Sequence, residues 1–201
     1  MRLAHGWTLA VTPGIPAGLV RDFVRPAVRA VPPALVRLLG PCRITLTGSL
    51  GRFVSEWDAP PGGLAITVAT AALDPHDATL ELLVCLGQAA WERLPEALAE
   101  IWWRRLDAEL RAHVAGEIDE DALAAKRRLL ANRAAARSPR RLEAYGAASF
   151  AATLAEYVHS LWHDVTVRSG PRHLPAPVLR RRLELLAAWF PPGRGYKLFP
   201  A

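Results

Sequence analysis

The chain has 201 residues, 51% of them hydrophobic, and it carries a formal net charge of +6. This length and apolar content suit one domain with a real hydrophobic core and argue against global disorder. The two cysteines, Cys42 and Cys85, are too few for a disulfide framework and lie in apolar stretches, so we expect buried thiols in a cytoplasmic protein.

The N-terminal part of the chain predicts two short helices after an irregular or strand-like segment at 1–17. Residues 17–39 carry apolar side chains about one helical turn apart, but Pro26 and a proline pair ending at Pro33 interrupt the pattern. Because proline suits the first turn of a helix, we expect the second helix to begin near Pro33. The apolar run 7–11 is too short for a secretory signal, and no stretch is long enough to span a bilayer, so we expect no membrane association.

The region 42–70 changes to alternating, β-branched sequence. Strands are expected at 43–47, 52–57 and 64–68, with glycine- and proline-containing turns between them. This pattern predicts a three-stranded antiparallel meander.

The region 76–190 is helical in pattern. The expected helices run from a cap at Asp77 or Thr79 to about residue 94, then over 95–114, 119–136, 147–163 and 177–190, with a short link at 139–145. The fold class is therefore α+β, a small antiparallel three-stranded sheet packed on a mainly helical bundle, in one domain over 1–201. The dense charge run at 126–141 follows acidic residues from Glu117 onward, which is typical of a solvated helix surface.

Two helical strings carry a family resemblance. Residues 82–90 read Leu-Leu-Val-Cys-Leu-Gly-Gln-Ala-Ala, and residues 150–158 read Phe-Ala-Ala-Thr-Leu-Ala-Glu-Tyr-Val. They resemble Leu-Leu-His-Glu-Leu-Gly-His-Ala-Leu and Phe-Ala-Glu-Ser-Phe-Ala-Glu-Tyr-Val of the gluzincin-like zinc metallopeptidases, which include small relatives of the anthrax lethal factor catalytic domain. The order of the expected elements resembles the core of that family as well, so the resemblance implies a zincin-like fold.

The resemblance places the zinc ligands at Val84, Gln88 and Ala152 and the general base at Cys85. Valine and alanine cannot coordinate metal, glutamine is a poor zinc ligand, and no carboxylate stands at the base position. The resemblance thus implies a catalytically inactive, zinc-free protein that acts as a scaffold or binds a protein or peptide partner in the old cleft. The alternative that 82–91 is simply a core helix that never bound metal predicts the same inactivity.

A second hypothesis is a metal-dependent hydrolase with a relocated site. His159 and His163 are spaced i, i+4, and with Glu156 or Asp164, together with Cys85, they form a candidate ligand set. The alternative is a polar, solvated helix face. His5, His76, His113 and His173 have no partner spacing and are expected at the surface or in loops.

A third hypothesis, nucleic-acid binding through Arg-rich helices, is less favoured because arginines are spread along nearly the whole chain. Within the string Trp102, Trp103, Arg104 and Arg105, we expect one tryptophan in the core and the other at its edge. An exposed tryptophan beside two arginines would be a candidate partner-binding anchor.

Overall fold

The computed structural model describes residues 1–132, 134–163, 170 and 172–199. The strands are β1 (Thr8–Val11), β2 (Cys42–Thr47), β3 (Ser55–Asp58) and β4 (Leu64–Ala69). The α-helices are α1 (Arg25–Ala30), α2 (Pro33–Leu39), α3 (Pro75–Trp91), α4 (Glu96–Arg111), α5 (Glu120–Leu130), α6 (Pro139–Ser160) and α7 (Ala176–Trp189). Shorter helical pieces are η1 (Ala4–Gly6), η2 (Leu19–Val24) and η3 (Ala135–Arg137).

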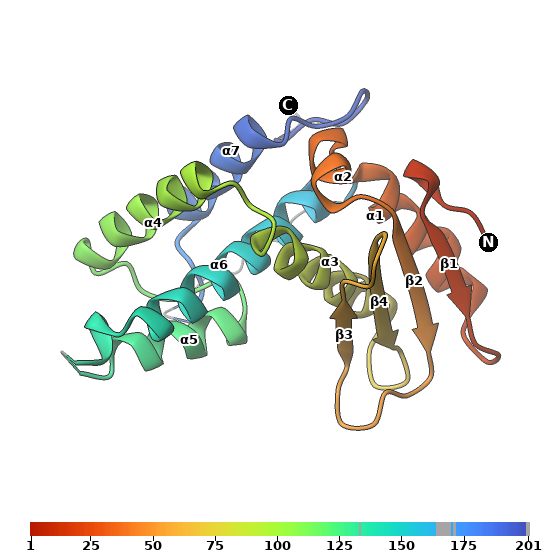
Figure 1. Ribbon diagram of the computed structural model, residues 1–201, viewed down its shortest axis with the longest axis horizontal. Helices are drawn as coiled ribbons and strands as arrows, with labels where there is room; N and C mark the ends of the chain where they lie inside the picture. The colour runs from red at the N-terminus through yellow and green to blue at the C-terminus, as the bar shows by residue number, and fades with distance from the viewer. Residues whose placement is uncertain (133, 164–169, 171, 200–201) are drawn as a thin grey trace.

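The fold is α+β, as the sequence predicts, with the sheet at one end of the molecule and α4 and α5 at the other (Figure 1). Helices α3 and α6 lie between these two ends and pack against each other more extensively than any other pair of elements. The central pair therefore joins the sheet to the outer helices.

The two short N-terminal helices are confirmed. The first is continuous from η2 into α1, and its π-helical part lies ahead of Pro26, whose missing N–H removes one backbone donor. The second, α2, begins at Pro33 and ends before Gly40, which takes a positive φ of 71°.

The antiparallel three-stranded meander is wrong. The sheet has four strands in the order β1-β2-β4-β3, with β1 and β2 parallel, β2 and β4 parallel, and β3 antiparallel to β4. The physical reason is the polarity of β3, which has no buried residue and carries Glu56 and Asp58. Such a strand suits an edge of the sheet, so the apolar strands β2 and β4 pair directly.

The boundaries of the central helices also differ from expectation. The N-cap of α3 is Asp74, whose side chain accepts a hydrogen bond from the Asp77 N–H, rather than Asp77 or Thr79. Helix α6 begins at Pro139, so the expected link at 139–145 is wrong, because proline at the first helical position needs no N–H partner. Helix α5 ends at Leu130, short of the expected 136.

The crossing of α3 and α6 depends on Gly87. A Cβ atom at this position would lie 2.7 Å from the Cα and the carbonyl oxygen of Ala151. Because backbone atoms cannot move aside like a flexible side chain, only glycine allows this approach. The close contact fixes how α3 and α6 face each other along the rest of their length.

A buried charge cluster of Glu109, Glu117, Lys126 and Arg182 holds the outer helices together. Arg182 is fully buried and donates to Glu109 at 2.6 Å and to Glu117 at 2.8 Å. Lys126 donates to the carbonyls of Val114 and Gly116 and lies 3.4 Å from Glu117. The expectation of a solvated charge run is therefore wrong for Glu117 and Lys126, which are 1% and 4% exposed.

The charges in this cluster compensate one another. Burial alone would raise the pKa of Glu117, but Arg182 and Lys126 lower it further than burial raises it, so the net direction is downward. Two carboxylates therefore face two cations, which offsets the cost of removing them from water. Within the described residues, no helix is both long enough and apolar enough to cross a membrane.

Candidate functional site

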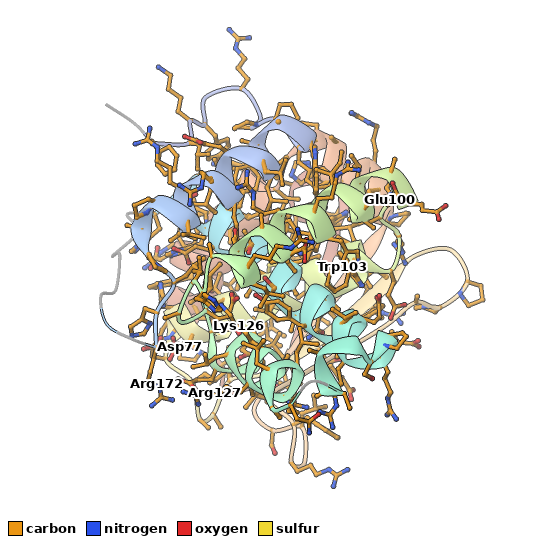
Figure 2. All side chains as sticks on the ribbon, turned by 90° about the vertical axis from the view of Figure 1, so that its left-hand side faces the viewer. Asp77, Glu100, Trp103, Lys126, Arg127 and Arg172 are labelled. Atoms are coloured by element: carbon orange, nitrogen blue, oxygen red, sulfur yellow. The ribbon has the colours of Figure 1, made fainter. Side chains whose placement is uncertain are left out.

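A pocket of about 500 Å³ lies between α3, the second half of α6 and the segment that leads into α5. Its lining includes apolar side chains, histidines and carboxylates. The carboxylates are Asp77, Glu81, Glu117, Asp119, Glu120 and Glu156. Asp77 and Arg172, which both line the pocket, are labelled near one edge of the view onto the helical end of the molecule (Figure 2).

The structure brings together two of the three positions at which the resemblance expects zinc ligands. Val84 on α3 and Ala152 on α6 both line the pocket, whereas Gln88 is exposed and does not line it. The hydrocarbon side chains of Val84 and Ala152 offer no lone pair, so the residues present do not fit a zinc ion at this place. No step of a zinc peptidase reaction can be derived from them.

Cys85, at the expected base position, is buried and does not line the pocket. Burial raises the pKa of this thiol to about 11, although a hydrogen bond with Ser55 lowers it in part. The thiol is therefore protonated at neutral pH and is neither a base nor a nucleophile. The suggestion that Cys85 joins a relocated metal site is wrong, because it does not share the pocket with the histidines.

Three histidines gather in the pocket, and we call them the histidine cluster: His76 near the start of α3, His159 in the last turn of α6, and His163 just after that helix. One ligand nitrogen from each lies within 4.8 Å of the other two. The Nε2 atoms of His76 and His159 are 3.1 Å apart, and the rings of His159 and His163 stack with centroids 5.1 Å apart. The prediction that His76 has no partner is therefore wrong.

His159 is only 4% exposed, so the alternative of a solvated face is wrong for this residue, while His163 is exposed. Burial, with smaller contributions from His76 and His163, lowers the pKa of His159 to about 4. The imidazole is therefore neutral at pH 7. Glu156 lines the same pocket and lies 4.0 Å from His159 Nδ1, whereas Asp164 falls outside the described residues.

Asp119 is the N-cap of α5 and also lines the pocket. Burial raises its pKa to about 6, with neighbouring carboxylates adding to the shift and a hydrogen bond from the Ala122 N–H opposing it. Burial is thus the main influence on charge here: it disfavours the ionised form of Asp119, as it disfavours the protonated form of His159.

The tryptophan pair on α4 divides as the sequence predicts. Trp102 is fully buried beneath Arg182, whose guanidinium carbon lies 5.7 Å from the ring centroid. Trp103, labelled in Figure 2, is half-buried against Gly146 of α6, while Arg104 is exposed and Arg105 half-buried beside it. This candidate anchor surface lies on α4, and none of its residues lines the pocket.

Comparisons with protein-family models, with curated proteins and with solved structures gave no match for this chain.

Sequence reasoning missed His76 as a member of the site, because its partner His159 is 83 positions away and no local spacing connects them. The only available signal was the position of His76 two turns before Val84 on one helix, which places both side chains along the same side of α3. His173, expected to be an isolated histidine, also lines the pocket.

Proposed function

We propose that this protein is a non-catalytic, metallopeptidase-like interaction module that holds a segment of a partner protein or peptide in the pocket between α3 and α6. The observation that carries the proposal is the joint placement of Val84 and Ala152 in the pocket wall, where the resembling peptidases need zinc ligands. The buried thiol of Cys85 at the base position supports the same conclusion. The pocket beside Val84 and Ala152 is nevertheless open, with a volume of about 500 Å³.

The charge of the pocket favours a basic partner segment. Apart from Glu117, which Arg182 and Lys126 compensate, its described lining holds five carboxylates against a single arginine, Arg172, in a chain whose net charge is +6. A lysine or arginine side chain of a partner would meet complementary charge here, next to the apolar surface of Leu80 and Val84. Two buried free thiols suit a reducing compartment, which supports a cytoplasmic site of action.

The alternative functions have weaker support. A hydrolase built on His159 and His163 would need a carboxylate free to activate water, but Glu156 faces the Nδ1 atom of His159. Nucleic-acid binding would need a continuous basic surface, and several arginines are instead paired with neighbouring carboxylates. These pairs are Arg21 with Asp22, Arg111 with Asp107, Arg172 with Glu120, and Arg180 with Glu184.

One experiment tests binding and inactivity together. Peptides are selected from a random library on the wild-type protein, and their binding is then measured on Val84→Trp, a variant whose large side chain fills the pocket. The wild type is expected to enrich peptides with basic residues, to bind them more weakly at high salt, and to cleave none of them with or without added Zn²⁺. Chelator-sensitive cleavage by the wild type, or equal binding by Val84→Trp, would contradict the proposal.

A restored protein provides the positive control. Val84→His, Cys85→Glu, Gln88→His and Ala152→Glu together rebuild the ligand set and the base of the resembling peptidases. The His76→Ala substitution is added so that any zinc bound is not held by the histidine cluster. Positions 85 and 88 do not line the pocket, so zinc uptake and peptide cleavage by this variant would show that the two helices can still adopt the geometry of the zinc peptidases. A folded variant that binds no zinc would contradict the likeness to metallopeptidases. It would leave the result of the peptide-binding experiment unaffected.

A further inference from the structure

The histidine cluster has the spacing of metal ligands. A tetrahedral zinc ion with Zn–N bonds of about 2.0–2.1 Å separates its ligand nitrogens by roughly 3.3 Å. The Nε2 atoms of His76 and His159 are 3.1 Å apart, and one ligand nitrogen from each of the three histidines lies within 4.8 Å of those from the other two. Two of the nitrogens are thus already at ligand spacing, and His163, whose ring stacks on that of His159, lies beside them.

The far nitrogen of each closely spaced ring faces a carboxylate. His76 Nδ1 lies 3.6 Å from Asp77, and His159 Nδ1 lies 4.0 Å from Glu156. Both separations are longer than a hydrogen bond, so these carboxylates act on the rings through their charge. A nearby negative charge favours the Nδ1–H tautomer and leaves the Nε2 lone pair for a metal, an orientation that is common among metal-binding histidines. His159 is 4% exposed, and its Nδ1 has no hydrogen-bond partner within the described residues.

A simple hydrogen bond between the two rings explains this arrangement less well. One ring would have to carry its proton on Nε2 to donate it to the other, and that ring would then present a bare Nδ1 lone pair to Asp77 or Glu156. With both protons on Nδ1, two Nε2 lone pairs face each other at 3.1 Å. A cation bound by both lone pairs resolves the conflict.

We propose that His76, His159 and His163 bind one divalent transition-metal ion, with Zn²⁺ as the preferred ion, in the wall of the pocket. Three imidazoles suit zinc and its neighbours in the transition series, whereas Mg²⁺ and Ca²⁺ prefer oxygen ligands. The site lies about two helical turns from Val84 and Ala152, so it is distinct from the zinc position of the resembling peptidases. Asp77 and Glu156 act as positioning residues for the imidazoles. The proposal does not depend on the peptidase likeness.

The test is metal titration of the full chain after treatment with a chelator. Zn²⁺ binding is followed by calorimetry, and Co²⁺ binding by the visible absorption of a tetrahedral ion. The wild type is expected to bind one ion per chain. His76→Ala is expected to weaken Zn²⁺ binding by about 100-fold or more, because it removes a ligand. Asp77→Asn, which changes only the carboxylate facing that ligand, is expected to weaken binding by about tenfold.

His113→Asn is the matched control, because His113 is exposed and lies outside the pocket. It is expected to bind Zn²⁺ like the wild type. His76 is partly exposed near the start of α3, so His76→Ala should fold, and its melting temperature without metal checks this. The proposal is overturned if the wild type takes up no Zn²⁺ or Co²⁺, if His76→Ala binds as tightly as the wild type, or if His113→Asn loses the same affinity.

Discussion

Asp119 shows how one residue serves both the fold and the pocket. Its carboxylate accepts the Ala122 N–H at 2.7 Å as the cap of α5, yet burial raises its pKa to about 6. A raised pKa means that the folded protein favours the protonated form. The stability that protonated Asp119 contributes is therefore present in full below the pKa that Asp119 has in the unfolded chain, near 4. It is lost as the pH rises through the pKa in the folded protein, about 6.

The substitution Asp119→Asn is expected to follow that sign. Asparagine keeps the capping oxygen but cannot ionise. The free energy of unfolding of the variant, taken relative to that of the wild type, should therefore rise by about 1–3 kcal/mol as the pH increases from 4.5 to 8. Urea unfolding at the two pH values measures the difference. Asp119→Ala, which also loses the cap, should be about 1 kcal/mol less stable than Asp119→Asn at both. A difference between wild type and Asp119→Asn that does not change with pH would contradict the pKa shift.

The local sequence pattern was enough to predict the surroundings of some side chains but not of others. The division of Trp102 from Trp103 and the burial of both cysteines follow from neighbours along one element, and both were predicted. His76 acts through His159, 83 positions away, and the carboxylate partners of Arg182 are 65 and 73 positions away. No spacing in the sequence reports such contacts, so the histidine cluster and the buried charge cluster appear only when the helices are placed in space.

At the scale of the elements, the crossing of α3 and α6 sets the geometry of the pocket. The Gly87→Ala substitution should lower the free energy of unfolding by about 1–3 kcal/mol, because the new methyl group meets the backbone of Ala151 at 2.7 Å. This range is the net change and already allows for the gain of about 1 kcal/mol that alanine brings to a helix interior. Gln88→Ala, on the exposed neighbour, should change stability by less than about 0.5 kcal/mol. Chemical denaturation of the three proteins checks this, and an increase in stability for Gly87→Ala would show that the helices separate at no cost.

Element positions were more predictable than element pairing. The two N-terminal helices, and the strands near 43–47 and 64–68, follow from proline positions and alternation, which are local signals. The order β1-β2-β4-β3 depends on which strand tolerates the edge of the sheet, and β1 was expected only as part of an irregular or strand-like segment. Which strands pair is decided by how their side chains are buried against the helices. The sequence offered one signal of this pairing: β2 and β4 are less polar than β3.

At the scale of the whole molecule, two different kinds of interior are joined by α6. In one part α6 buries apolar side chains such as Leu154 and Phe150, whose ring packs against Trp91 of α3 and Trp102 of α4, whereas in its first half it supplies Tyr145 and Ser149 to the buried charge cluster. Arg182 on α7 reaches both α4 and α6 through this cluster. Because one helix belongs to both interiors, we expect the chain to unfold in a single cooperative transition.

Arg182→Met tests this expectation. Methionine has nearly the same volume but leaves Glu109 and Glu117 buried without their main cation, so the free energy of unfolding should fall by about 3–5 kcal/mol. The exposed neighbour supplies the control, since Arg181→Met should stay within about 0.5 kcal/mol of the wild type. Urea unfolding followed by tryptophan fluorescence and by far-ultraviolet circular dichroism should give coincident curves for all three proteins, with only that of Arg182→Met shifted to lower urea. Separate transitions by the two probes would mean that the outer helices and the sheet unfold independently despite the continuity of α6. An unshifted curve for Arg182→Met would mean that the buried charge cluster contributes no net stability.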